Sequence, residues 1–394
     1  MWKNWSGSLT FEPSAIQKPD TEEEVAEIVK KASKSAKTVR VVGAGHSSSS
    51  LVETKGILIS LEKFKGISDP DNNLNRATVF AGMQIHEAGE ELNKAGLAMH
   101  NTGDVDVQTV AGAIGTGTHG TGKKLQNLSA MLVGVRMVTG EGEIKNFSIE
   151  NDPELFKALR VSLGSMGIFI KMHLQLLPKF KLHRKEFYAR SDDALKNLDE
   201  LINNNRNFDF YWYPRSDCVK LRIMNEPGKD VNEIPYAKPD KEMQGWSNEV
   251  LPRTRELKFD EMEYSIPFGN AVDCFAEIRE RVKKIHRRTV GWRILFRTVA
   301  ADENYLSTIS KRDTVTISLH HNAGLEFRDY FSDIEPIFLK YNGRPHWGKK
   351  HTQKAGQLKS MYPEWNKFME LRQKFDPENV FVSDYISELF GIKK

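Results

Sequence analysis

A glycine-rich loop with a single histidine contains the residue types that could most directly hold a ligand and react with it. The loop, Val41 to Ser50 (VVGAGHSSSS), follows the β-prone run Thr38 to Val42. Glycines let backbone N–H groups turn toward an anion such as a diphosphate with no Cβ in the way. His46 is the only large side chain in the loop, and a mostly neutral imidazole is nucleophilic near pH 7. The loop could therefore hold a cofactor, even covalently. The alternative is a glycine turn with a solvated histidine.

A second glycine-rich stretch runs from Asn101 to Gly122 and contains six glycines and five threonines. Glycine adds no side-chain burial and costs backbone entropy, so we predict a wrapping loop here and not a packed helix or strand. A flexible linker is the alternative, but it would lack the interleaved hydrophobic residues Val105, Val107, Val110, Ala111 and Ile114. The stretch therefore favours a loop that lines a ligand.

Three further places carry cations or histidines. Gly343 to Lys350 (GRPHWGKK) is a basic, aromatic turn that could set a cation beside an anionic ligand or a reduced cofactor; a solvated turn is the alternative. Arg297 shares one face of a predicted strand with Leu295, so its guanidinium needs an acceptor or solvent. His320 and His321 end another strand on opposite faces, so at most one can enter a shared cleft.

Composition and absent motifs exclude several classes of function. The 57 basic and 53 acidic residues give a net charge of +4, too balanced to indicate nucleic-acid binding. A Walker lysine, HExxH, a Ser-His-Asp order and CxxC pairs are all absent, so we predict no metal. The two cysteines suit a reducing compartment. With no signal peptide and no apolar run of about 18 residues, we expect a cytoplasmic protein without a membrane anchor.

Short strands and helices alternate in the first part of the chain, which is typical of an α+β or α/β fold. The patterns predict helices after Thr21, over 85–95 and from Asp152, strands over 56–61, 77–82 and 169–177, and a hairpin of 131–139 with 143–147. From Lys179 aromatic and charged residues rise. There we predict strands over 208–214, 220–224, 261–267, 293–299 and 314–320, helices over 270–286 and 328–342, and a loop over 229–255.

Several motifs match one protein family in both order and spacing. They are VRVVGAGHSSSSL (39–51), VQTVAGAIGTGTHGTG (107–122), SLGSMGIF (162–169), EMEYSIP (261–267), FRTVAAD (296–302), RDTV (312–315), RPHWGK (344–349) and FDPENVF (375–381). Together the motifs resemble the vanillyl-alcohol-oxidase-type (PCMH-type) flavoproteins, in particular the sugar-1,4-lactone oxidase and alditol oxidase branch. The resemblance covers almost the full length of the chain.

The resemblance implies an α+β fold. An FAD-binding domain of two subdomains would span residues 1–178, and a substrate domain would span 179–394, with a large antiparallel sheet covering the flavin. The segment from about 345 to 394 would pack back on the FAD domain. His46 would be bonded to the flavin 8α-methyl group. The residues expected to bind FAD are Val42, Gly43, Ala44, Gly45, His46, Ser47, Ser48, Gly103, Gly112, Thr116, Gly117, Thr118, His119, Gly120, Ile168 and His346.

The catalytic candidates that the resemblance implies are Arg297, Lys349, His320 and Asp104. Arg297 would bind substrate and Lys349 would stabilise a developing alkoxide or the anionic reduced flavin. The family commonly has glutamate two positions before this arginine, whereas this chain has Leu295, so His320 or Asp104 would replace that acceptor, or the substrate or rate would differ. In relatives, glycine at the position of Gly103 admits oxygen and alanine is associated with dehydrogenases.

These features predict an oxidase that uses FAD to oxidise a hydroxyl-bearing carbon of a sugar-derived substrate. The expected second product is hydrogen peroxide. The preferred substrate is an L-gulono- or D-arabinono-1,4-lactone, which would give a 2-keto lactone. An alditol oxidase acting on xylitol or sorbitol is the closest alternative. A flavin-binding protein without turnover and a module for another nucleotide are more distant. The expected partners are a sugar lactone or polyol and molecular oxygen.

Overall fold

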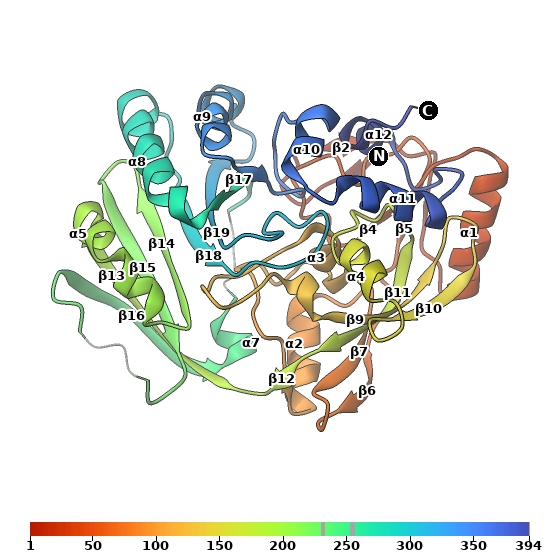
Figure 1. Ribbon diagram of the computed structural model, residues 1–394, viewed down its shortest axis with the longest axis horizontal. Coiled ribbons are helices and arrows are strands. Elements are labelled where there is room, and N and C mark those ends of the chain that lie inside the picture. Colours follow the sequence, from red (N-terminus) through yellow and green to blue (C-terminus); the bar gives the residue numbers. More distant parts are fainter. Residues whose placement is uncertain (230–232, 253–256, 394) are drawn as a thin grey trace.

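The first part of the chain forms two main sheets with helices around them (Figure 1). It also forms two two-stranded sheets, which pair β1 (Trp2–Lys3) with β2 (Thr10–Phe11) and β8 (Leu97–Ala98) with β12 (Leu177–Pro178). The two main sheets differ in strand direction. The computed structural model describes residues 1–229, 233–252 and 257–393. One sheet is parallel, in the order β3 (Ala15–Gln17), β5 (Ile57–Ser60), β4 (Val39–Val42). The other is antiparallel, in the order β10 (Ile144–Ser148), β9 (Leu132–Val138), β11 (Ile168–Gln175), β7 (Arg76–Phe80), β6 (Ile67–Asp71). The predicted hairpin of β9 and β10 is confirmed.

The helices around these sheets lie where the sequence predicts them. Helix α1 (Glu22–Lys34) begins after Thr21, whose hydroxyl accepts the Glu24 N–H at 3.2 Å. Three glutamates in its first turn and lysines in its last turn complement the helix dipole. Helices α2 (Ile85–Lys94) and α4 (Pro153–Leu159) also lie where the sequence predicts them.

The prediction that 101–122 is a loop throughout is wrong, because helix α3 (Val110–Thr116) lies inside it. The Thr109 hydroxyl caps the helix by accepting the Gly112 N–H at 3.3 Å, and Gly117 ends it in the left-handed conformation. Val110, Ala113 and Ile114 are fully buried in the core of this half. Tertiary packing of this short apolar stripe therefore outweighs the low helix propensity of its glycines.

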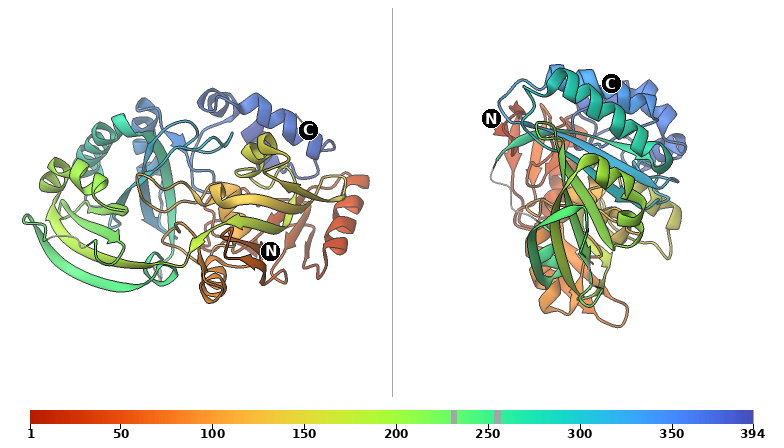
Figure 2. Two further views of the ribbon diagram at one scale, coloured as in Figure 1. Left: turned by 60° about the horizontal axis from the view of Figure 1, so that its bottom comes forward. Right: turned by 90° about the vertical axis from the view of Figure 1, so that its left-hand side faces the viewer.

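The second part of the chain contains the predicted large antiparallel sheet, which confirms the α+β fold class. Eight strands follow in the order β16 (Ala237–Trp246), β13 (Lys181–Arg190), β15 (Cys218–Asn225), β14 (Asn207–Tyr213), β18 (Ile294–Val299), β19 (Thr314–Asn322), β17 (Phe259–Pro267), β20 (Arg344–Pro345). In Figures 1 and 2 this sheet lies at the end of the molecule opposite helix α1.

One face of the large sheet is apolar and the other is polar. Helices α5 (Ser191–Lys196), α6 (Leu198–Asn203), α8 (Ala271–Arg281) and α9 (Arg328–Lys340) contribute to the core on the apolar face, together with residues such as Phe210 and Phe296. Side chains alternate along each strand, so Asp209 and Arg297, in the same two strands, lie on the opposite face. This polar face carries the candidate site.

The prediction of a loop over 229–255 is wrong for residues 237–250. β16 pairs with β13 at the edge of the large sheet, and helix α7 (Ser247–Val250) follows it. β16 is solvent-exposed along most of its length, so it lacks the apolar alternation that signals a strand, and Pro239 sits at a register shift against Phe187. Residues 230–232 and 253–256 of the predicted loop lie outside the described residues.

The C-terminal helices α10 (Ala355–Met361), α11 (Trp365–Phe375) and α12 (Asp384–Phe390) lie above the N-terminal half in Figure 1. Trp347, Leu358, Phe368 and Phe390 belong to the same hydrophobic core as the two main sheets. The predicted division at residues 178 and 179 stays a prediction. Within the described residues, no helix is both long and apolar enough to cross a membrane.

Candidate functional site

The loop after β4 forms one wall of a cleft of about 300 Å³ in the N-terminal half. A Cβ added to Gly43 would lie 2.0 Å from Thr109 Oγ1, so only glycine lets this loop approach the start of α3. Gly45 has a φ of +64°, and its Cβ would lie 2.8 Å from the Trp2 ring. The predicted residues that line this cleft are Val42, Gly43, Ala44, Gly45, His46, Ser47, Gly112, Thr116 and Ile168. Backbone and small side chains thus shape the cleft.

A second, smaller cavity of about 60 Å³ lies against the polar face of the large sheet. All four catalytic candidates, Asp104, Arg297, His320 and Lys349, line it, together with Gly103, Thr118, His119 and His346. Residues about 245 positions apart in sequence therefore meet in one pocket.

Three of the predicted FAD-binding residues line neither cavity. The Ser48 N–H donates to the Gly348 carbonyl at 2.8 Å, which links the loop to the C-terminal turn. Gly117 is the left-handed cap of α3. Gly120 passes so close to the Thr102 carbonyl that a Cβ would lie 2.4 Å from its oxygen. These residues shape the walls behind the cavities.

His46 lies where the two cavities meet, because it lines both of them, as does Gln108. The His46 ring packs against Trp5 with 4.3 Å between ring centroids. Its Nδ1 atom is buried and has no hydrogen-bond partner. Burial, followed by the charge of Lys349, lowers the pKa of His46 to about 4, so the imidazole is neutral at pH 7. An orphaned, neutral ring nitrogen at this junction fits attachment of a ligand that spans both cavities.

Strands β14, β18, β19 and β17 bring the polar side chains of the pocket into rows. Tyr211 lies opposite Leu295, Leu295 opposite Ser318, and Ser318 opposite Glu263. The next row contains Asp209 and Arg297. Directly opposite residues of an antiparallel sheet share one face, so the register itself assembles the pocket wall.

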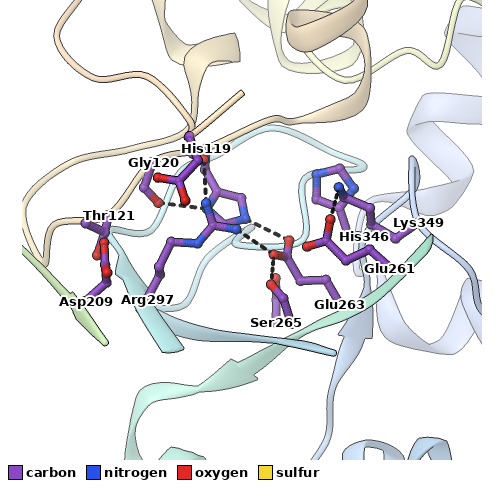
Figure 3. A network of polar contacts seen from close by, with 12 residues as sticks. His119, Gly120, Thr121, Asp209, Glu261, Glu263, Ser265, Arg297, His346 and Lys349 are labelled. Carbon is purple, nitrogen blue, oxygen red and sulfur yellow. Dashed lines mark hydrogen bonds and ion pairs between the residues drawn. The ribbon is translucent and has the colours of Figure 1, made fainter. Parts of the chain in front are cut away.

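Glu263 is the centre of a buried polar network (Figure 3). It accepts hydrogen bonds from Arg297 Nη2 at 2.7 Å, from the Ser318 hydroxyl, and from His119 Nε2 at 2.9 Å. Burial alone would raise the pKa of Glu263, but His119 and Arg297 hold it well below its usual range. The ligand-type atoms of His119, Glu263 and His346 lie within 4.8 Å of one another, although Arg297 already supplies a cation to this carboxylate. The network fixes Arg297 in the pocket.

Glu261 lies two residues earlier on β17 and pairs with Lys349 Nζ. Its Oε1 atom lies 3.6 Å from His320 Nε2. Burial would raise the pKa of Glu261, but Lys349 and His320 lower it to about 2, so the carboxylate is ionised.

Asp104 is held by a third set of contacts. The Tyr211 hydroxyl donates to its Oδ2 atom and Arg222 Nη1 donates to Oδ1 at 2.9 Å. Arg222 also makes a bidentate pair with the buried Asp209. Together Tyr211 and Arg222 fix the position of Asp104.

Sequence reasoning missed Glu261, Glu263, Tyr211 and Arg222. The alternating Glu-Met-Glu of 261–263 was a usable signal, because it puts both carboxylates on one strand face. What the pattern could not supply was the register that places them beside Arg297 and Lys349.

Comparisons with known proteins agree with this geometry. A model of the FAD binding domain matches residues 13–148, and a model of the D-arabinono-1,4-lactone oxidase family matches 172–238 and 231–389. The chain is 34% identical to the L-gulono-1,4-lactone dehydrogenase of Mycobacterium tuberculosis, over 99% of each chain. It is 28% identical to the L-gulonolactone oxidase of Mus musculus, over 99% of this chain and 98% of that one. The fold is similar to crystalline cholesterol oxidase from B. sterolicum, with a TM-score of 0.86, 16% identity, and coverage of 99% and 96%.

Fold and cleft together define an FAD-binding oxidoreductase of the PCMH type. Within that class, the chain belongs to the D-arabinono-1,4-lactone oxidase family.

Proposed function

We propose that the chain oxidises a hydroxyl-bearing carbon of a sugar-1,4-lactone, of the L-gulono- or D-arabinono- type, with FAD as cofactor. The observation that carries this proposal is the charge balance of the pocket that joins the FAD cleft at His46. Apart from its histidines, the pocket contains three acids and three bases: Asp104, Glu261, Glu263, Arg293, Arg297 and Lys349. Paired donors and acceptors without net charge suit a neutral, polyhydroxylated ligand.

The residues of the pocket divide the work of binding and charge stabilisation. Arg297, fixed by Glu263, donates to oxygen atoms of the substrate. Lys349, which pairs with Glu261, supplies a cation that stabilises negative charge developing on the substrate oxygen. FAD, when bound, supplies the hydride acceptor. The substrate names of the curated relatives favour a lactone over an alditol.

A panel of substrates tests this proposal. The purified flavoprotein is mixed without oxygen with L-gulono-1,4-lactone, D-arabinono-1,4-lactone, xylitol and sorbitol, and the loss of flavin absorbance is followed. We expect bleaching by at least one lactone at lower concentration than by either polyol. Bleaching by polyols alone would replace the proposal by an alditol oxidase, and no bleaching at all would indicate a flavin-binding protein.

We further propose that His46 bonds covalently to the flavin. The neutral, unpartnered Nδ1 atom at the junction of the two cavities supports this. After denaturation, the yellow colour should stay with the wild-type chain, whereas His46→Ala should release it. Release of the yellow colour from the wild-type chain would contradict the covalent bond without contradicting FAD binding.

The proposed electron acceptor is molecular oxygen, with hydrogen peroxide as product. Gly103 lines the pocket and supports this assignment, because it leaves space beside Thr118 and His119. A dehydrogenase is the second candidate, since the Mycobacterium tuberculosis relative is one. Turnover with artificial dyes but without peroxide in air would favour the dehydrogenase.

A further inference from the structure

Three carboxylates line the substrate pocket, and they differ in how much hydrogen-bonding capacity the protein already uses. Leu295 contributes an apolar surface in the row that contains Glu263. The carboxylates of the pocket that could accept a substrate hydroxyl are Asp104, Glu261 and Glu263, and His320 is the histidine predicted for that role.

Asp104 and Glu263 are both committed to other groups. Each oxygen of Asp104 accepts a hydrogen bond, one from Tyr211 and one from Arg222. Glu263 accepts three, from Arg297, His119 and Ser318, and its side chain is 1% exposed. Removing such partners to bind substrate would leave buried charges unpaired, which costs several kcal/mol. Neither carboxylate is suited to take up a proton.

His320 is also unsuited to accept a proton. Its Nδ1 atom lies 3.2 Å from the Arg293 carbonyl oxygen, so this nitrogen must carry hydrogen. Its Nε2 atom lies 3.6 Å from Oε1 of the ionised Glu261 carboxylate. Both ring nitrogens therefore face protein oxygen atoms, so the ring is placed to hold Glu261 and not to accept a proton from the substrate.

We propose that Glu261 is the catalytic proton acceptor of the pocket, an assignment that rests on the proposed function. Its Oε2 atom pairs with Lys349, while Oε1 lies beyond hydrogen-bond distance of His320 and can accept the substrate hydroxyl. Lys349 then lies beside the same substrate oxygen. One ion pair thus supplies both the base and the cation for the oxidation.

The proposed oxidation moves one proton to Glu261 and two electrons to FAD. The substrate O–H proton passes to Oε1 of Glu261, and the C–H hydrogen leaves with its electron pair to oxidised FAD. The C–O bond becomes a carbonyl, so the substrate loses two electrons and FAD gains them. As Glu261 becomes neutral, its attraction for Lys349 falls, and the ammonium group is available to the substrate oxygen. The proton leaves Glu261 for solvent after product release.

Stopped-flow measurement of flavin reduction by L-gulono-1,4-lactone without oxygen tests this assignment. We expect Glu261→Gln to bind FAD and lactone but to reduce the flavin at least about 100-fold more slowly than wild type. His320→Gln is the comparison variant and should slow reduction less, because His320 only supports Glu261. A wild-type rate in Glu261→Gln, or a greater loss in His320→Gln, would overturn the proposal.

Chemical rescue separates a base from a structural residue. Formate should accelerate flavin reduction in Glu261→Ala, since a small carboxylate can occupy the vacated space, whereas chloride should not. A rate that does not respond to formate would assign Glu261 a structural role and overturn the proposal. If no lactone reduces even the wild-type flavin, the proposed function fails together with this inference. A reducible wild type with an equally reducible Glu261→Gln contradicts this inference alone.

Discussion

The proposed FAD cleft and the proposed substrate pocket touch at His46, yet they are built in opposite ways. One wall of the cleft is a continuous loop, in which glycines bring the backbone close to the side chains of Thr109 and Trp2. The pocket instead gathers charged side chains from β17 and β18, from Asp104 and from the C-terminal turn. The shape of the cleft therefore depends on positions without a side chain, whereas the pocket depends on charged side chains.

This difference determines which substitutions each region tolerates. Adding a methyl group should damage the cleft by overpacking it, with little effect on polar chemistry. Removing a charge should damage the pocket, because its partner is then left buried and unpaired. Substitutions in the two regions should therefore fail in different ways.

Among the substitutions that test this contrast, Arg297→Met should cause the largest loss of activity. It removes a donor from the pocket and leaves the buried Glu263 without its cation, so we expect lactone kcat/KM to fall about 10²–10³-fold. Arg281→Met is the matched control, because its pair with Asp333 lies at the surface, with 43% of the arginine side chain exposed. That exposed pair should contribute little. Similar losses in both variants would show that the pocket does not depend on buried charge.

Gly43→Ala should weaken FAD binding through steric conflict alone. The new Cβ would lie 2.0 Å from Thr109 Oγ1, and overpacking of about 1–3 kcal/mol corresponds to about 5–150-fold in affinity. Titration of the apoprotein with FAD measures this. Gly269→Ala, which meets nothing within 4 Å, is the control and should bind FAD like the wild type. An unchanged affinity for FAD in Gly43→Ala would contradict the view that the cleft requires glycine at this position.

Gly103→Ala applies the same methyl addition to the pocket. The Cβ would lie 3.3 Å from the His119 carbonyl oxygen and 3.6 Å from Thr118 Cγ2, so a small shift accommodates it. We expect flavin reduction by lactone to be preserved and reoxidation by oxygen to slow about tenfold, or ~1.4 kcal/mol in the barrier. Stopped-flow reoxidation measures this, with an artificial dye as the control acceptor. A slower reaction with the dye as well would indicate general damage to the pocket.

The same contrast explains how much the sequence could predict. His46 and its flanking glycines are adjacent in sequence, so a short motif is enough to predict their chemistry. Helix α3 was missed because its stability comes from the burial of Val110 and Ile114. The glycines around these residues lower the helix propensity of the segment, so the sequence does not predict a helix there. The large sheet was predicted as a class of structure, but its exposed edge strand β16 has no periodic pattern to detect.

The pocket was only partly predictable. Arg297 and Lys349 were identified by motif, whereas their partners Glu263 and Glu261 depend on the pairing of β17 with β19 and of β19 with β18. Strand register is a non-local property, and no short motif encodes it. Leu295 was recognised as a departure from the family, but the location of the remaining acceptor required the three-dimensional arrangement.

The smallest expected effect concerns stability in mild acid. Burial is the main cause that lowers the pKa of His346 to about 3 and of His351 to about 4, so the folded chain keeps both rings neutral. The unfolded chain protonates each ring near pH 6.5, so folded stability falls as the pH drops from about 6.5 toward the folded pKa. Each histidine should contribute at most about 1.4 kcal/mol per pH unit to this loss.

Substitution of either histidine tests this linkage. Between pH 6.5 and 4.5 the thermal unfolding midpoint of the wild type should fall, and His346→Gln or His351→Gln should each make that fall shallower. The double variant should be shallower still, because the two rings take up protons independently in the unfolded chain. Above pH 7 neither ring titrates, so all four proteins should show the same pH dependence there. An equally steep acid dependence in the double variant would mean that the loss between pH 6.5 and 4.5 arises from other buried histidines, such as His46, whose pKa is also lowered to about 4.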